Sequence, residues 1–428
     1  MMRLLRSLLA FLAKAVLSRY APKVVAVSGS VGKTSTTRAV TAVLARSFHT
    51  RGSAKNHNNE IGVPLTVLGE AKAGGKSVMS WAGILWRGLL LAFGPKRPYP
   101  RVLVLEMATD HPGDLEYLTA LAPPDVSVLT AVAEEHTEFL GDLDGVAAEE
   151  GTVVRVLGAE GIAVLNADDE RVAAMADGLG DRAVLYGFGP KARVRAENVS
   201  AELALGTVFT RFTLRIDGRE FPANLPDALG EGHVAAALAA ASVALAFGID
   251  PAVIPYGLAE YQAPPGRLRV LPGIKGTTLV DDAYNSSPRA VSLALRTFRT
   301  LPLARGGRRI AVLGDMLELG ALTEASHRQV GREAAASGVE MLIGVGPAAG
   351  LICAAAREAG MPRERVFHMG TSEEAGRFLQ GRIAPGDAIL VKGSQGIRTE
   401  KIVKELMAEP ERAGELLVRQ SAEWIGRD

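Results

Sequence analysis

The sequence of 428 residues contains one cysteine, Cys353, and almost no excess of charge, with 48 basic and 47 acidic residues. A single cysteine excludes an internal disulfide and a cysteine-based metal cluster, and it fits a reducing compartment. A formal net charge of +1 provides no general attraction to polyanions, so we expect no nucleic acid partner. Any binding of phosphate must therefore come from local geometry.

The sequence also lacks a hydrophobic run as long as the ~20 apolar residues that a transmembrane helix needs. Residues 1–20 have apolar side chains at near-helical spacing, interrupted by Arg3, Arg6, Lys14 and Arg19. We interpret this segment either as an amphipathic helix packed on the next domain or as one lying on a membrane surface. A second apolar stretch, residues 78–93, contains Arg87 and leaves peripheral membrane contact open. A secretory signal is not indicated, because no small-residue cleavage site precedes Pro22.

From residue 23 onward, short apolar segments alternate with helical ones. Strands are predicted at 102–107, 126–130, 162–166 and 183–186, and then at 278–281, 309–313, 341–345 and 388–391. Buried strands that alternate with helices predict an α/β protein with mostly parallel sheets. Residues 194–222 alternate polar and apolar side chains and are expected to add antiparallel strands. The length favours two or three domains, and the segment 262–266, rich in proline, is the predicted linker.

The sharpest motif lies between the β-branched apolar run that begins at Val24, a predicted strand, and the helix predicted at residues 34–45, and it reads Ser28, Gly29, Ser30, Val31, Gly32, Lys33, Thr34. Its glycines let successive N–H groups point at phosphate oxygens, and the helix adds its positive end. Lys33 would reach the β- and γ-phosphates, and the Thr34 hydroxyl would ligate Mg²⁺. Ser30, Gly32 and Ser35 are further candidates for nucleotide binding. The motif is a shortened P-loop, with an ordinary tight turn as the alternative, and it predicts a P-loop ATPase domain.

Two more candidates follow predicted strands. Glu106 ends the strand at 102–107, where α/β sheets present ligand-binding groups, and its carboxylate could hold Mg²⁺ beside Thr34. His136 follows the strand at 126–130 and is a candidate second metal ligand. Read alone, a loop histidine is more often structural, and a glutamate at a strand end is sometimes only solvated.

Several further blocks, read together with the P-loop, resemble the Mur ligase family, the cytoplasmic ATP-dependent amide ligases of peptidoglycan synthesis. These blocks are residues 56–66, 104–107, 136, 139–141, 165–169, 266–268, 281–288, 312–320, 327 and 391–396. The similarity extends over residues 23–407 and is greatest to the member that adds D-alanyl-D-alanine to the UDP-muramoyl tripeptide. It implies a central ATP-binding domain at 23–265 and a Rossmann-like C-terminal α/β domain at 266–428, and the amphipathic helix expected from the residue spacing at 1–22 precedes them.

The resemblance also implies a mechanism with ATP and Mg²⁺ as cofactors. ATP phosphorylates a carboxylate, an amine attacks the acyl phosphate, and an amide, ADP and phosphate result. Lys33 would stabilise the transferring phosphoryl group, Thr34 and Glu106 would hold the first Mg²⁺, and His136 would help to hold a second. The remaining implied contacts are Asn59, Arg267 and Asp282 with the nucleotide, and Tyr284, Asn285 and Lys392 with the incoming amine.

Three departures from the family pattern affect these expectations. The family usually opens with a domain that binds the UDP-sugar, whereas here the P-loop begins at residue 28. A lysine that the family modifies to a carbamate is matched by Glu150, and we expect this carboxylate to replace the carbamate as a catalytic metal ligand. Where the family has a histidine and two asparagines, residues 230–236 offer His233, which we expect to contact the nucleotide instead.

The predicted function is therefore an ATP-dependent amide ligase that adds D-alanyl-D-alanine or a similar amine to a cell-wall peptide precursor. A related ligase that makes a different amide and a nucleotide-binding regulatory module are the alternatives. The expected partners are small molecules, with peripheral membrane contact left open. We expect a monomer located in the cytoplasm, with membrane association as a further option.

Overall fold

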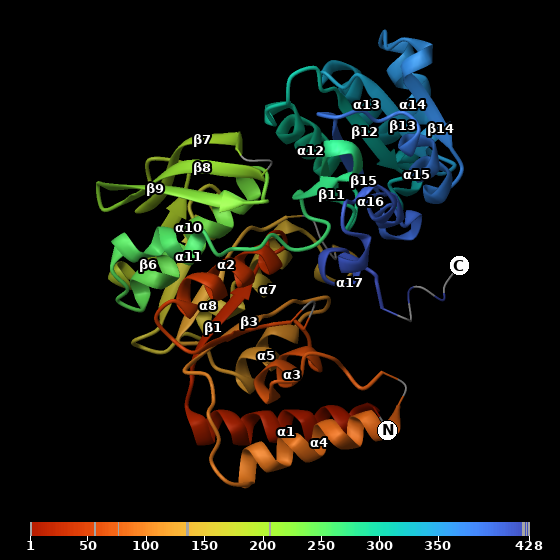
Figure 1. The fold of residues 1–428 in the computed structure, drawn as a ribbon. Coiled ribbons are helices and arrows are strands. Elements are labelled where there is room, and N and C mark those ends of the chain that lie inside the picture. The colour runs from red at the N-terminus through yellow and green to blue at the C-terminus, as the bar shows by residue number, and fades with distance from the viewer. Residues whose placement is uncertain are drawn as a thin grey trace. The chain divides into compact units, whose positions relative to one another are not determined.

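The computed structural model describes residues 2–54, 57–75, 77–133, 137–204, 207–421, 424 and 426. The chain divides into two compact units (Figure 1). The first contains residues 1–199, 212–225 and 232–261, and the second contains residues 200–211, 226–231 and 262–428. Each unit is organised around its own sheet.

The sheet of the first unit has the order β2-β3-β1-β4-β5-β6-β7-β8-β9 in the described part of the chain. Its strands are β1 (Lys23–Ser28), β2 (Thr50–Gly52), β3 (Val102–Glu106), β4 (Val126–Leu129), β5 (Ile162–Asn166), β6 (Ala183–Gly187), β7 (Val194–Ala204), β8 (Thr207–Ile216) and β9 (Arg219–Pro226). β1 lies between β3 and β4 and is parallel to both, so the carboxyl ends of these strands meet at one edge. The boundary between the two units passes through β7, β8 and β9.

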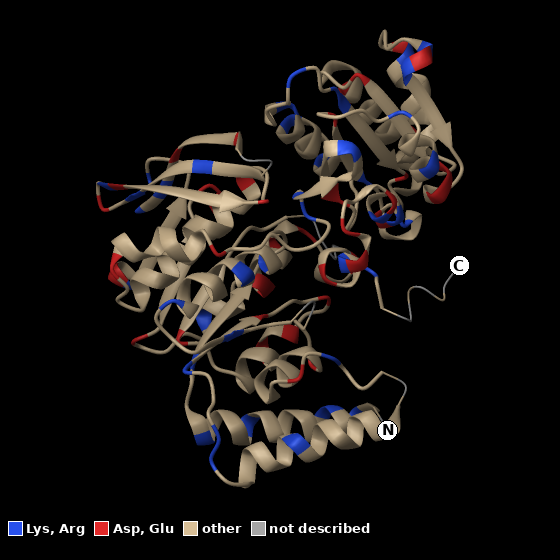
Figure 2. Ribbon diagram, viewed as in Figure 1, with Lys and Arg blue, Asp and Glu red and all other residues tan. Residues whose placement is uncertain are grey.

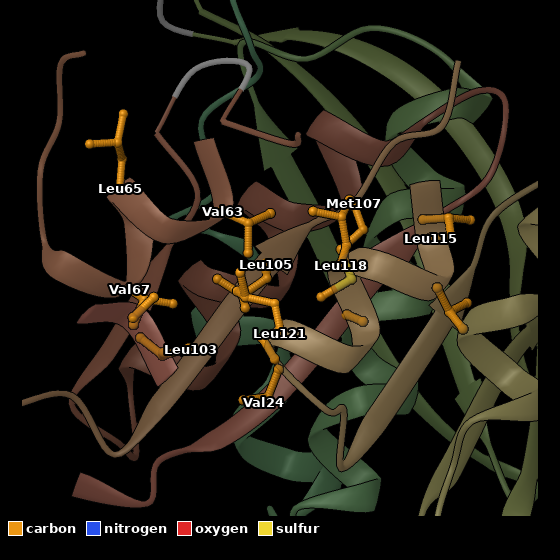
Figure 3. Packing of buried hydrophobic residues seen from close by; sticks show 14 of the residues in the cluster. Val24, Val63, Leu65, Val67, Leu103, Leu105, Met107, Leu115, Leu118 and Leu121 are labelled. Carbon is orange, nitrogen blue, oxygen red and sulfur yellow. The ribbon is translucent and has the colours of Figure 1, made fainter. Parts of the chain in front are cut away.

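The helices of the first unit connect and cover these strands. They are α1 (Met2–Tyr20), α2 (Lys33–Ala45), α3 (Gly62–Leu68), α4 (Val78–Phe93), α5 (Asp114–Leu121), α6 (Thr137–Leu140), α7 (Leu143–Glu150), α8 (Thr152–Arg155), α9 (Glu170–Ala174), α10 (Glu231–Ala246) and α11 (Ile254–Leu258). Figure 3 shows how Leu103 and Leu105 of β3 pack against α3 and α5 in the hydrophobic core. β1 is a run of β-branched and small apolar residues buried beyond Lys23, as a central parallel strand requires.

The second unit contains a sheet of order β10-β11-β15-β12-β13-β14 in its described residues. Its strands are β10 (Arg269–Gly273), β11 (Thr277–Asp282), β12 (Arg309–Gly314), β13 (Met341–Val345), β14 (Val366–Met369) and β15 (Ala388–Lys392). Its helices are α12 (Pro288–Thr300), α13 (Thr323–Ala336), α14 (Ala349–Glu358), α15 (Ser372–Gln380), α16 (Glu400–Leu406) and α17 (Ala413–Leu416). All pairs are parallel except β10 with β11, and two separate hydrophobic clusters pack against the sheet.

These observations confirm the α/β fold class with mostly parallel sheets. The region predicted to add antiparallel strands forms β7, β8 and β9. Asp217 and Gly218 both have positive φ and join β8 to β9, which is the two-residue turn of a β-hairpin.

The N-terminal segment forms α1, which contacts α3, α4 and α5. Its residues Leu9, Leu12, Ala13 and Val16 are buried in the core of the first unit. The interpretation as an amphipathic helix packed on the following domain therefore agrees with the structure. Among the described residues, none of the helices is long and apolar enough to span a bilayer.

Candidate active site

The predicted P-loop connects β1 to α2 through two glycines in left-handed conformations. Gly29 has φ 121°, and Gly32, with φ 96°, is the N-cap of α2. A Cβ atom added at Gly29 would lie 2.3 Å from Oγ1 of Thr130, the residue after β4, so only glycine fits there. The loop therefore passes close to the end of β4. It continues into α2, a 13-residue helix whose N-terminus carries a partial positive charge.

The side chain of Lys33 folds back over this loop. Its Nζ donates to the carbonyl oxygen of Gly29 and to that of Ser30, at 3.2 Å in the second case. Both acceptors are neutral, so exchanging them for phosphate oxygens would give the ammonium group stronger, charge-assisted bonds. The contact of Lys33 with the terminal phosphates stays a prediction.

Thr34 and Glu106 meet at the start of α2 and the end of β3. The Thr34 hydroxyl lies 3.2 Å from Glu106 Oε1, which also accepts a hydrogen bond of 3.1 Å from Asn58 Nδ2. The backbone N–H of Glu106 donates to Ser53 Oγ over 3.0 Å, and its side chain is buried. The structure thus brings together the two residues predicted to bind the first Mg²⁺. A hydroxyl and a carboxylate oxygen are hard donors of the kind that Mg²⁺ prefers.

Glu150, the last residue of α7, contacts the first two residues of the P-loop. Its Oε2 accepts from the Ser28 hydroxyl at 2.6 Å and from the Gly29 N–H at 2.7 Å, and the side chain is buried. The carboxylate is therefore bound directly to the backbone of the P-loop. His136, its predicted partner at a second metal, lies outside the described residues. Within the described residues there is no group of three His, Cys, Asp or Glu side chains placed to hold a metal.

Ser30 joins the P-loop to the chain that follows β4. Its N–H donates to the Ala131 carbonyl over 2.8 Å, and its hydroxyl accepts from the Ala133 N–H over 3.0 Å. Ser35 is buried in the first turn of α2. Both predicted nucleotide contacts thus belong to the loop and its helix, and Ser30 ties the loop to the chain after β4.

Two other predicted nucleotide contacts have local partners instead. The Asn59 Oδ1 accepts from the backbone N–H groups of Ile61 and Gly62, at 3.2 Å and 2.9 Å, so this side chain caps the turn leading into α3. His233 is buried on α10, and its Nδ1 lies 2.7 Å from the Tyr261 hydroxyl. Neither of these contacts involves the P-loop, and both roles remain predictions.

In the second unit, the five predicted residues form one cluster at the carboxyl ends of β11 and β15. Asp282 and Lys392 are paired in the strand register, and Lys392 Nζ lies 2.7 Å from Asp282 Oδ2. The same ammonium group donates to the Asn285 carbonyl over 2.9 Å. The guanidinium of Arg267 stacks 4.4 Å from the centre of the Tyr284 ring, a cation–π contact.

Burial dominates the electrostatics of this cluster. It raises the pKa of Asp282, although the Lys392 ammonium acts in the opposite direction by favouring the carboxylate. Burial also raises the pKa of the neighbouring Asp281 to about 7, against the N–H bonds that Asp281 accepts from Ala283 and Gly266. The cluster therefore combines a satisfied ion pair with a carboxyl group whose charge is costly.

Sequence reasoning missed three groups at these sites. Asn58, the neighbour of the predicted Asn59, contacts Glu106, and Ser28, the first residue of the P-loop, binds Glu150 together with the Gly29 N–H. Asp281 was treated as part of a strand end, yet it is fully buried. The alternation of side chains along β11 could have indicated this burial, because successive side chains of a strand point to opposite faces of the sheet.

The fold and the loop together define a P-loop α/β protein with a second α/β unit, and comparison with known proteins gives the family. The model of the Mur ligase middle domain matches residues 92–244, and that of the Mur ligase glutamate ligase domain matches residues 266–395. The UDP-N-acetylmuramoyl-tripeptide–D-alanyl-D-alanine ligase of Escherichia coli is 31% identical over 386 residues, which cover 90% of this chain and 76% of that protein. The Bacillus subtilis enzyme of the same name is 29% identical, with 93% and 79% covered. The chain belongs to the Mur ligase family.

Solved structures agree with this assignment at the level of the fold. MurF from Acinetobacter baumannii superposes with a TM-score of 0.75 at 24% identity, covering 93% of this chain and 79% of its own. MurF ligase from Thermotoga maritima, solved in complex with ADP, gives a TM-score of 0.72 at 24% identity, covering 95% and 84%. The relatives are ligases, and the chain is an enzyme of this class, an ATP-dependent amide ligase.

Proposed function

We propose that the chain joins D-alanyl-D-alanine to UDP-N-acetylmuramoyl tripeptide at the expense of ATP. The proposal is supported by relatives of that name, which match over nine-tenths of this chain. The observation that carries it is the P-loop itself, with Lys33 on neutral carbonyl acceptors and Thr34 3.2 Å from a buried carboxylate. A protein that only sensed nucleotides would need the loop but not the second set of polar residues in the other unit.

The reaction has two steps in this proposal. First, a carboxylate oxygen of the tripeptide attacks the γ-phosphorus of ATP, so that the P–O bond to ADP breaks and an acyl phosphate forms. The amine of the dipeptide then attacks the carbonyl carbon, the C–O bond to phosphate breaks, and the amine proton is lost. Lys33 would leave its two carbonyl acceptors and bind the transferring phosphoryl oxygens, where negative charge is concentrated.

The donors beside the P-loop fit Mg²⁺, which the family is expected to use. Thr34 and Glu106 would hold one ion, because a hydroxyl and a carboxylate oxygen already lie 3.2 Å apart there. When bound, such an ion neutralises charge on the phosphate oxygens. Glu150 is proposed as a ligand of a second ion together with His136, since its carboxylate is fixed against the loop by Ser28 and Gly29.

The cluster of the second unit is proposed to serve the other reactants. Arg267 and Asp282 would contact the nucleotide, and Tyr284, Asn285 and Lys392 would lie near the amine. Support comes from their gathering at one end of two neighbouring parallel strands, the edge at which α/β sheets present ligand-binding groups. His233 and Asn59 remain candidate nucleotide contacts. The single cysteine and the use of ATP support a cytoplasmic location, and we propose a monomer.

The test is phosphate release from Mg-ATP by the purified chain with UDP-muramoyl tripeptide and D-alanyl-D-alanine, and products are identified by mass spectrometry. Release that requires both substrates, with a product heavier by one dipeptide, is expected. Turnover only with another acceptor or amine would support the ligase activity but assign a different substrate. ATP binding without turnover on any pair of a broad panel would contradict the proposal and favour a regulatory module.

A matched variant separates the site from contaminating ATPases. Thr34→Ala removes a hydroxyl that contacts Glu106, and it should abolish most of the substrate-dependent release. Thr41→Ala, on the same helix, removes a hydroxyl that donates to the Thr37 carbonyl of that helix over 2.7 Å, and it should leave the release nearly unchanged.

A further inference from the structure

Charge is distributed unevenly along the chain although the total is close to zero. Residues 1–100 contain fifteen Lys and Arg but only two acidic residues, Glu60 and Glu70, which leaves 33 basic and 45 acidic residues for the rest. Neither α1 nor α4 contains an acidic residue. Figure 2 shows these two helices with basic positions and without acidic ones.

α1 and α4 lie side by side and form what we call the outer helix pair, residues 2–20 and 78–93 (Figure 1). Arg19 at the end of α1 donates to the Ala92 carbonyl at 2.8 Å and to the Gly94 carbonyl at 2.6 Å, so it caps the end of α4. Gly88 allows close packing, because a Cβ there would lie 3.1 Å from a methyl group of Leu12. The pair is therefore a folded platform whose inner face belongs to the core.

The outer face of the pair exposes apolar side chains in helical register. On α4, Met79, Trp86 and Phe93 recur at intervals of seven residues, and Met79 and Trp86 are 85% and 61% exposed. On α1, Leu4, Leu8 and Phe11 follow one another at the spacing of a single helix face, and Leu4 is 66% exposed. The rings of Phe11 and Phe93 stack with centroids 6.2 Å apart, so the two strips join. Exposed apolar surface of this kind marks an interaction site.

Basic side chains accompany the strips. Arg3 and Lys14 are exposed on α1, and Lys96 and Arg97 are exposed just beyond α4. Within the described residues, none of these four forms an ion pair, whereas Arg6 is paired with Glu60 at 2.9 Å and Arg87 with Glu70 at 2.6 Å. The face thus combines Leu, Phe and Trp with basic residues at its border. This is the composition of helices that lie in the interface of an anionic bilayer.

We propose that the outer helix pair is a peripheral membrane-binding surface whose partner is an anionic phospholipid bilayer. Trp86, Met79, Phe93 and the apolar strip of α1 enter the headgroup region, and the basic border contacts lipid phosphates. Charge complementarity selects this partner over a second copy of the chain, because two such faces would bring like charges together. A helix of 19 residues, about 28 Å long, lies along the surface and does not need to cross it.

The test uses the full chain and co-sedimentation with phosphatidylcholine vesicles, with and without phosphatidylglycerol. Binding is expected only with phosphatidylglycerol, and raising the salt concentration should weaken it. The apolar variant Leu4→Ser/Met79→Ser/Trp86→Ser and the charge variant Arg3→Glu/Lys14→Glu should each lower the vesicle affinity about tenfold or more. Trp86→Phe should keep the binding but lose most of the blue shift of tryptophan emission that vesicles cause.

Matched controls come from the second unit, where Leu322→Ser changes another exposed leucine and Arg296→Glu/Arg299→Glu reverses two exposed charges of one helix. Both controls should bind vesicles as the unmodified chain does. Absence of binding to phosphatidylglycerol vesicles, or binding that both variants retain, would overturn the proposal. A lipid-free dimer dissociated by the apolar variant would overturn it too and assign the face to self-association. None of these readouts depends on the ligase reaction, so the proposed function stands or falls separately.

Discussion

The two lysines that the sequence singles out, Lys33 in the first unit and Lys392 in the second, are held in opposite ways. Lys33 Nζ donates to two neutral carbonyl oxygens of its own loop. Lys392 is buried and forms an ion pair of 2.7 Å with Asp282, besides a bond to a carbonyl oxygen. One charge is positioned where a stronger anionic partner could replace weak acceptors, and the other already has its counter-ion.

This difference indicates that the same type of side chain can serve activity at one site and stability at another. A lysine that donates to carbonyl oxygens contributes little to the free energy of unfolding, because those hydrogen bonds replace equivalent bonds to water. A buried ion pair is costly to break, since removal of one partner leaves the other charge desolvated. We therefore expect changes at the P-loop to affect the reaction and changes at the second cluster to affect the fold as well.

The largest effect is expected for Lys33→Ala. Loss of the group that stabilises the transferring phosphoryl should lower kcat by about a hundredfold to a thousandfold, with the thermal unfolding midpoint nearly unchanged. Substrate-dependent phosphate release and a thermal melt measure the two quantities. Arg46→Ala, at the exposed end of the same helix, is the control and should behave like the unmodified chain. A large loss of stability in Lys33→Ala would remove the contrast with Lys392.

Next comes Lys392→Ala, which leaves the Asp282 carboxylate buried without its ammonium partner. The free energy of unfolding should fall by about 3–5 kcal/mol, as denaturant titration would measure. The double variant Lys392→Met/Asp282→Asn removes both charges and should recover much of the loss. If the single variant is as stable as the unmodified chain, the ion pair is not the structural element that its burial indicates.

The third prediction concerns the pH dependence of the second unit. Because burial raises the pKa of Asp281 to about 7, the folded state holds a proton that the unfolded state releases near pH 4. Stability should therefore fall as the pH rises from 4 to 7, by at most on the order of 4 kcal/mol, and level off above. Asp281→Asn should lack this slope in urea titrations at several pH values.

Asp387 offers the control of opposite sign in the same unit. Arg308 and backbone N–H groups lower its pKa, so its contribution is present above pH 4 and is lost as the pH falls. Comparison of Asp387→Asn with the unmodified chain should thus show a slope only at acid pH. If the stability of Asp281→Asn still falls between pH 4 and 7, other groups are responsible for that slope.

The smallest effect is expected for Glu150→Gln. This variant tests the proposed metal-binding role of Glu150 most directly. The amide retains an oxygen that can accept from Ser28 and Gly29, but it lacks the charge that would hold a cation. The Mg²⁺ concentration giving half the maximal rate should rise about tenfold, with modest loss of stability. An unchanged Mg²⁺ dependence would leave Glu150 as a support of the loop alone.

Much of the first site could be predicted because its parts are close in sequence or end neighbouring strands. The glycines, Lys33 and Thr34 form one motif, and Glu106 follows from the rule that parallel strands present ligands at their carboxyl ends. The contact of Asn58 with Glu106 could not be predicted, because the sequence does not show that Asn59 is instead bonded to the turn before α3. His233 was assigned to the nucleotide, but only the fold reveals the Tyr261 hydroxyl beside it.

The second cluster shows where sequence reasoning stops. Its five members were named from a resemblance, yet nothing local indicates that Lys392 faces Asp282, which is 110 positions away in the chain. That pairing depends on the register of β11 with β15, which the fold alone determines. The helix at residues 2–20 was predicted as amphipathic, but its neighbour α4 and the shared outer face required the structure.

The central claim is that ATP activates a carboxylate as an acyl phosphate, and oxygen transfer tests it most directly. The tripeptide acceptor is labelled with ¹⁸O in its reacting carboxylate, and the released phosphate is examined by mass spectrometry after a complete reaction. The account predicts one ¹⁸O atom in each phosphate, because the C–O bond that breaks leaves the labelled oxygen on phosphorus. Phosphate without the label, with amide still formed, would contradict the acyl phosphate and require a different activation of the acceptor.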